Sequence, residues 1–266
     1  MSATSRYLSR STCRLVFVAS LAVSSFASAQ VSSQGAPPVP PQRGARGGGI
    51  GSAFGMDKQI AMAVEESMGN HVESSAHLAL TPLRAATSAD SARAAKVAVD
   101  LRRGIEKYKD VSLAVADGFE VFAPQAEQPV YHYVHPIKML REQSRFDAAD
   151  PSTLIYQKNA KGELDLIGAM YMAAPRSTPE ELDARVPTGV ARWHRHVNYC
   201  FPTDRRRMAE ARDGKPLFGP VGLISTAAEC TAAGGRFSAE LFGWMVHANV
   251  FGATDAASIW GGGHKH

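Results

Sequence analysis

Residues 154–172, Leu-Ile-Tyr-Gln-Lys-Asn-Ala-Lys-Gly-Glu-Leu-Asp-Leu-Ile-Gly-Ala-Met-Tyr-Met, decide the fold. They contain two apolar runs, 154–157 and 164–172, in which the residue pattern shifts toward a period of two. The runs are joined through Asn159-Ala160-Lys161-Gly162, a turn that contains glycine. This arrangement is typical of an antiparallel β-hairpin.

The sequence around this hairpin predicts further strands. Residues 130–134, 190–199 and 242–251 have the same short-period apolar pattern. Residues 202–240 carry many charges, prolines and glycines, so we expect a long irregular excursion before the last strand.

Two segments that precede these strands have a helical period. Residues 57–68 predict a short helix that Asp57 caps and Gly69 ends. Residues 89–116 predict a longer helix, because apolar side chains fall at steps of three and four residues. Together these elements predict one α+β domain over residues 57–262, with N-terminal helices packed on a mostly antiparallel β-sheet. Residues 263–266 are expected to form a mobile tail.

The first 29 residues have the layout of a secretory signal peptide. Three arginines precede an apolar run at 15–23, and Ala27-Ser28-Ala29 provides a small-x-small cleavage site before Gln30. A membrane anchor is the alternative, but the run is only about half of the ~20 residues that span a bilayer. Residues 30–56 are rich in proline, glycine, serine and glutamine and predict a flexible linker. We therefore expect a soluble periplasmic or secreted protein.

Composition excludes several classes of protein. The chain has 266 residues, 45% of them hydrophobic, and a net charge of +4 from 29 basic and 25 acidic residues. Removal of residues 1–29 takes away three arginines and no acid, which leaves a net charge of +1. This balance gives no electrostatic case for a nucleic-acid partner, and no later stretch is long and apolar enough for a membrane span.

Histidines carry the strongest chemical signal. His194 and His196 are two residues apart in a predicted strand, so their imidazoles point to one face and supply half of a tetrahedral metal site. His132 and His247 lie in two other predicted strands. If these strands are neighbours, four imidazoles meet on one face. His135 is left out, because on a regular strand it faces away from His132. The alternative is that these histidines only form hydrogen bonds.

Several blocks resemble an uncharacterised family of bacterial exported proteins. The most specific are W-H-x-H-x-N-x-C, residues 193–200, and W-M-x-H, residues 244–247; the likeness covers roughly residues 92–252. In that family an acidic residue often stands where Met170 is, so a carboxylate ligand at that position is in doubt here. In the same family Asn often stands at the position of His135, which agrees with leaving His135 out of the metal site. The family has no established activity, so the resemblance supports the site and not a reaction.

Cys200 and Cys230 are the only cysteines after the signal peptide. In an exported chain they are expected to form a disulfide that encloses about 30 residues. The alternative is that Cys200 serves as a thiolate ligand for copper or zinc, because it lies at an even offset from His196.

Other side chains are candidates for the surroundings of the metal. In an enzyme, Asn198 or Arg195 would orient a substrate, and the pocket would be lined by Tyr131, Tyr133, Tyr171 and Trp193. Met170, Met172 and Met245, with Met139, offer thioether ligands to Cu(I), although methionines more often fill cores.

Three functions follow from these features, and the choice among them stays open at this point. The first is a periplasmic or secreted protein that binds copper or zinc through His132, His194, His196 and His247. The second is a metalloenzyme, a hydrolase or oxygenase, with three histidines and an open coordination position. The third is a metal-free structural or ligand-binding domain of the cell envelope. A metal ion is the only partner that the sequence indicates.

Overall fold

The computed structural model describes residues 57–68, 75–82 and 84–261. The predicted signal peptide, linker and tail lie outside these residues, as does Gly69. By their contacts, all described residues belong to one structural unit, Pro41–His266. A search of the described helices finds none that is long and apolar enough to cross a membrane.

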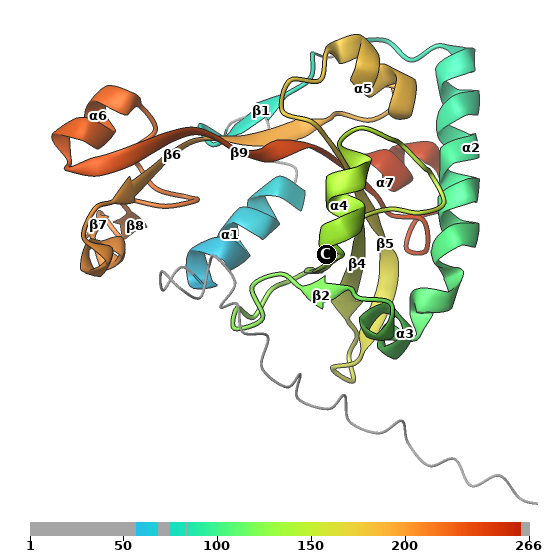
Figure 1. Cartoon of the computed structure of the whole chain (residues 1–266), viewed down its shortest axis with the longest axis horizontal. Helices are drawn as coiled ribbons and strands as arrows, with labels where there is room; N and C mark the ends of the chain where they lie inside the picture. The colour runs from blue at the N-terminus through green and yellow to red at the C-terminus, as the bar shows by residue number, and fades with distance from the viewer. Residues whose placement is uncertain (1–56, 69–74, 83, 262–266) are drawn as a thin grey trace, which may run out of the picture. The chain divides into compact units, whose positions relative to one another are not determined.

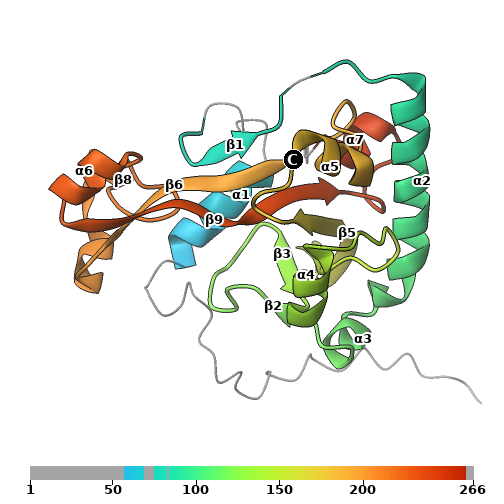
Figure 2. The same ribbon diagram turned by 45° about the horizontal axis from the view of Figure 1, so that its top comes forward.

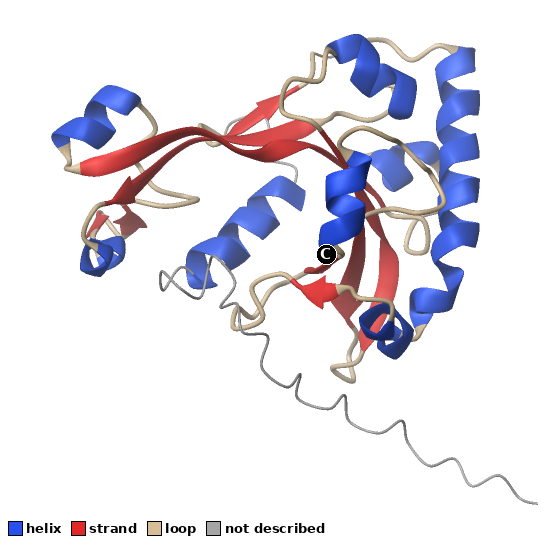
Figure 3. Ribbon diagram, in the orientation of Figure 1, coloured by secondary structure: helices blue, strands red, loops and turns tan. Residues whose placement is uncertain are grey.

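One sheet of seven strands organises the described chain, in the order β1-β6-β9-β5-β4-β3-β2. Figure 3 draws the strands in red. Every neighbouring pair in the sheet is antiparallel. Its strands are β1 (Leu78–Leu80), β2 (Glu120–Val121), β3 (Tyr131–Val134), β4 (Thr153–Lys158), β5 (Leu164–Ala173), β6 (His194–Pro202) and β9 (Gly235–Ala248). Together with the helices described below, this sheet confirms the predicted α+β class.

Strands β4 and β5 form the predicted hairpin, and Asn159 fixes its turn. The Asn159 side-chain oxygen accepts hydrogen bonds from the backbone N–H groups of Lys161, at 2.9 Å, and Glu163, at 3.0 Å. Gly162 has a φ of +80°, a left-handed conformation that glycine adopts without steric cost. The turn is therefore determined by its local sequence.

Strands β6 and β9 differ from their predicted limits. β6 starts at His194 and not at residue 190, because Val190 and Ala191 donate their N–H groups to the Pro187 carbonyl and form a turn. β9 starts at Gly235, so it pairs along most of β6. The predicted excursion is correspondingly shorter and contains η4 (Arg205–Ala209), β7 (Ala211–Arg212), β8 (Lys215–Pro216) and α6 (Ala227–Ala232).

The prediction of one continuous helix over 89–116 is wrong, because the helix is interrupted. The structure has α2 (Ser88–Ile105), a 3-10 turn η3 (Glu106–Lys109) and α3 (Val111–Ala116). Asp110 begins α3, since its carboxylate accepts the Ser112 N–H at 2.9 Å. A capping side chain of this kind competes with continuation of the preceding helix. The other helices are α1 (Asp57–Met68), α4 (Pro136–Glu142), α5 (Pro179–Arg185) and α7 (Ala256–Trp260).

Two apolar clusters cover the two faces of the sheet. One packs α2, through Leu101 and Ile105, against Tyr156 and other side chains of the sheet. The other packs α1 against the opposite face, where Ile155 and Met170 are buried. Figures 1 and 2 show α1 and α2 on opposite sides of the strands. We call these the α2 face and the α1 face.

Gly168 of β5 allows β9 to lie close to β5. A Cβ at this position would lie 1.8 Å from the Ala248 carbonyl oxygen. We expect Gly168→Ala to lower the free energy of unfolding by about 3 kcal/mol, because the backbone must move. Urea denaturation measures the change. Gly162→Ala is the control: its added Cβ meets nothing within 4 Å, so it carries only the left-handed strain of about 1–2 kcal/mol. Equal losses in both variants would contradict this account.

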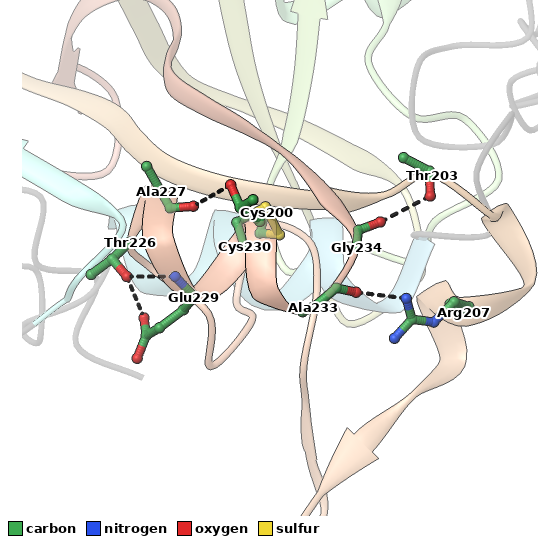
Figure 4. The surroundings of a disulfide bond; sticks show 10 residues. Cys200, Thr203, Arg207, Thr226, Ala227, Glu229, Cys230, Ala233 and Gly234 are labelled. Atoms are coloured by element: carbon green, nitrogen blue, oxygen red, sulfur yellow. Dashed lines mark hydrogen bonds between the residues drawn. A yellow bond between two sulfur atoms is a disulfide. The ribbon is translucent and has the colours of Figure 1, made fainter.

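The predicted disulfide is present in the structure (Figure 4). It joins Cys200 of β6 to Cys230 of α6, with 5.5 Å between their Cα atoms and 30 residues of separation. Nearby, Thr203 Oγ1 donates to the Gly234 carbonyl at 2.9 Å, and Arg207 donates to the Ala233 carbonyl at 2.6 Å. The disulfide thus fixes the excursion to β6. Because both sulfurs are bonded to each other, the alternative of a Cys200 thiolate ligand is wrong.

The double variant Cys200→Ser/Cys230→Ser should lose about 3–4 kcal/mol of unfolding free energy. A crosslink that encloses about 30 residues removes that much chain entropy from the unfolded state. Denaturation of the oxidised protein, the reduced protein and the variant measures the loss. An oxidised and a reduced protein that unfold at the same urea concentration would refute this expectation.

Candidate metal centre

Strand register brings the predicted histidines to the α1 face. In the sheet, His247 is paired with Met170, Met170 with Thr153, and Thr153 with Val134. Directly paired residues of antiparallel strands share a face. Since His132 lies two residues before Val134 on β3, it shares that face as well.

The same reasoning places the two histidines of β6. His194 is paired with Met245 of β9, which lies two residues before His247. His196 follows two residues after His194 and therefore points the same way. We call His132, His194, His196 and His247 the histidine group.

Ring contacts connect the members of the histidine group in a series. The Nε2 atoms of His132 and His247 are 3.5 Å apart. The rings of His247 and His194 are stacked, with centroids 5.1 Å apart and an interplanar angle of 28°. The centroids of His194 and His196 are 5.7 Å apart. Among residues 57–68, 75–82 and 84–261, however, no three His, Cys, Asp or Glu side chains are already arranged to hold a metal ion.

Burial leaves two ring nitrogens of the group without hydrogen bonds. His132, His194 and His247 are 7%, 4% and 8% exposed. Among the described residues, His132 Nδ1 and His194 Nε2 have no hydrogen-bond partner. A buried polar atom without a partner costs about 1–3 kcal/mol, so each such atom requires an explanation.

Three histidines of this group, His132, His194 and His196, are held in the neutral form. Burial lowers the pKa of His132 from 6.5 to about 4. Burial, and then the neighbouring His196 and His132, lower the pKa of His194 to about 3. His196 is lowered to a pKa of about 4 by burial and then by His132 and His77. A neutral imidazole keeps the nitrogen lone pair that a metal ion requires.

Tyr199 orients His196, and sequence analysis missed this contact. The Tyr199 hydroxyl lies 2.7 Å from His196 Nδ1. Residues three apart on a regular strand face opposite sides, but Asn198 has a φ of +63° and turns Tyr199 back toward His196. When Nδ1–H donates to the hydroxyl, Nε2 of His196 keeps its lone pair. An asparagine inside an apolar strand was the signal that could have revealed this bend.

The predicted aromatic lining is not beside the histidine group. Tyr131, Tyr133 and Trp193 are buried in the cluster on the α2 face. Each lies at an odd offset from His132 or His194, so strand alternation turns it away from them. Trp193 Nε1 instead donates to the Val186 carbonyl at 3.2 Å.

The remaining predicted residues fall in different places. Met170 is on the α1 face beside His247. Asn198 donates to the Ala76 carbonyl at 2.9 Å, which fixes the strand and does not orient a substrate. His135, left out of the site, caps the N-terminus of α4. His77 contacts two backbone carbonyls, of Val197 and Gly222, at 3.3 and 2.6 Å.

At the outer end of the group, Phe242 lies over His196. Between the pairs His194–Met245 and His196–Leu241, β9 has two more residues than β6. Phe242 in this bulge has a φ of +65°. Its ring is 46% exposed and lies 6.4 Å from the His196 ring, centroid to centroid. His196 itself is half-buried, in contrast to the other three histidines.

Comparisons of the chain with protein-family models, curated proteins and solved structures give no significant match. The functional argument therefore rests on the geometry of the histidine group.

Acid should destabilise the fold through these histidines. In the unfolded chain they titrate near 6.5, whereas the folded pKa values of His132, His194 and His196 are about 4, 3 and 4. Below pH ~6.5 the unfolded state therefore binds protons that the native state does not, and stability falls by roughly 1 kcal/mol per histidine by about pH 5.5.

Urea denaturation near neutral pH and at about pH 5.5 measures this loss. His194→Gln removes one titrating group and should make the loss smaller by roughly 1 kcal/mol. Glu142, whose pKa is raised to about 7 by burial, gains stability over the same range and offsets part of the loss in both proteins. An equal change of unfolding free energy with pH in the parent and in His194→Gln would contradict the assignment of a neutral His194.

Proposed function

We propose that this chain is an exported protein that binds a transition metal ion, copper or zinc, through His132, His194, His196 and His247. The observation that carries the proposal is the 3.5 Å separation between His132 Nε2 and His247 Nε2. Two nitrogens bound to one tetrahedral ion at about 2.0–2.1 Å lie about 3.3–3.4 Å apart. A hydrogen bond between them would be shorter, about 3.0 Å.

Chemistry of the group supports the same function. The lowered pKa values of His132, His194 and His196 keep these imidazoles neutral, and neutral imidazole is a common ligand of both zinc and copper. His194 Nε2, buried without a hydrogen bond, provides a further donor atom. Rotation of side chains is needed to close a four-nitrogen shell, because the rings lie in series.

Binding, storage or delivery fits this group better than catalysis. Four histidines on one ion leave no coordination position for a substrate. The open cleft lined by Arg93, Lys96 and Asp100 of α2 belongs to the opposite face of the sheet. Neither observation provides a substrate site next to the histidines.

Export is part of the proposal. The layout of residues 1–29 supports cleavage before Gln30. The Cys200–Cys230 disulfide supports an oxidising compartment, the periplasm or the outside of the cell.

A second candidate is a metal-free domain whose histidines stabilise the fold. The stacked rings of His194 and His247 favour it, as does the lack of a ready three-ligand arrangement among the described residues. Metal titration separates the two candidates.

Titration of the exported, untagged chain with Zn(II) and with Cu(I) should give one ion per chain. The double variant His194→Ala/His247→Ala should abolish this binding. Removal of a residue that only hydrogen-bonds to a metal ligand lowers metal affinity about 10–100-fold, and removal of two ligands lowers it further. Competition with a coloured chelator gives affinity, and elemental analysis gives stoichiometry.

Two controls make this experiment specific. His135→Asn keeps a good helix cap outside the group and should bind as the parent does. A chain shortened before His264 tests the terminal histidines and should bind equally well. Zero uptake by the parent would leave the metal-free candidate, and full binding by the double variant would show that the ligands are wrong.

A further inference from the structure

Three methionines share the α1 face with the histidine group. Met170 of β5 is paired directly with His247, and Met245 of β9 is paired directly with His194. Met172 is paired with Met245. Direct antiparallel partners have Cβ atoms about 4.5–5.5 Å apart, so these thioethers adjoin the imidazoles.

These methionines are buried together in one cluster. Met170, Met172 and Met245 are 7%, 5% and 5% exposed. A methionine side chain has three rotatable bonds, so its sulfur can turn toward a neighbouring ion without movement of the backbone. The cysteine sulfurs in the same cluster are consumed by the disulfide. Thioethers are therefore the soft donors that this face offers.

Charge on the face distinguishes between candidate ions. The sheet positions around the histidines hold Val134, Thr153, Ile155 and the three methionines, none of which is charged. Desolvation becomes more costly with the square of an ion's charge, and an uncharged donor set does not neutralise it. A monovalent ion is therefore easier to bury here than a divalent one.

One carboxyl group approaches β5 from α4. Glu142 accepts hydrogen bonds from Ser152 and from the Met172 backbone N–H. Burial raises the pKa of its carboxyl to about 7, with the hydrogen bonds from Ser152 and Met172 acting in the opposite direction. Glu142 is thus only partly ionised near neutral pH; its Oε2 is engaged by these protein donors, whereas its Oε1 is buried without a hydrogen bond among the described residues.

From these observations we infer that the ion is cuprous copper, Cu(I), and that the sulfurs of Met170 and Met245 take two positions of its four-ligand shell, with imidazoles of the histidine group in the other two. Thioether and imidazole donors together suit Cu(I), whereas Zn(II) has little affinity for thioethers. This inference rests on the proposed metal binding by the histidine group and adds the identity and oxidation state of the ion.

The test compares Cu(I) and Zn(II) in the exported, untagged chain. Cu(I) is supplied under reducing conditions too mild to open the disulfide and is titrated against a coloured Cu(I) chelator, with a parallel Zn(II) competition. Met170→Leu/Met245→Leu should lower the ratio of Cu(I) to Zn(II) affinity by about 10–100-fold. X-ray absorption at the copper edge should show sulfur neighbours in the parent and fewer in the variant.

Met208→Leu is the matched control. Met208 is 6% exposed in the same cluster but lies on η4, outside the strand pairs of the histidines. Methionine-to-leucine changes conserve volume, so all three proteins should remain folded, which circular dichroism checks. The control should keep the Cu(I) to Zn(II) ratio of the parent.

Each outcome separates this inference from the proposed function. If the methionine variant keeps the parent's affinity ratio and copper shows no sulfur neighbours, the inference is wrong while histidine binding stands. If Zn(II) binds more tightly than Cu(I), the inference is also wrong. If neither ion binds the parent, or if His194→Ala/His247→Ala binds both ions as tightly as the parent does, the proposed function itself fails.

Discussion

Pairing of β9 with both β5 and β6 is the constraint on which the structure depends. Its C-terminal half is shared: residues 244–248 pair with β5, while Met245 also pairs with His194 of β6. One strand thus links the hairpin to the segment that carries the disulfide. The same pairing decides which side chains meet, because it sets His247 beside Met170 and Met245 beside His194.

Local sequence was sufficient for those elements whose hydrogen bonds are local. The turn at Asn159 and Gly162 is fixed by its own side chain and glycine, so the hairpin was predictable. The shared face of His194 and His196 follows from strand alternation alone. The break after Ile105 was missed, because an apolar helical period continues through it while Asp110 begins a new helix.

The order of the strands in the sheet could not be predicted from local sequence. The sequence shows no reason why β3 and β9, which have β5 and β4 between them in the sheet, should bring His132 and His247 into contact. Tyr133 and Trp193 were expected beside the histidines on chemical grounds, whereas alternation buries them on the α2 face. Tyr199 was missed because the left-handed backbone of Asn198 breaks the alternation that sequence reasoning assumes.

The bulge of β9 has a consequence for how an ion would reach the histidines. Phe242 stands partly in solvent above His196, the one half-buried ring of the group. The other three rings lie deeper, in the series His194, His247 and His132. Of the four rings, His196 is therefore the one that solvent reaches most readily, and an ion bound as proposed above would meet it before the other three.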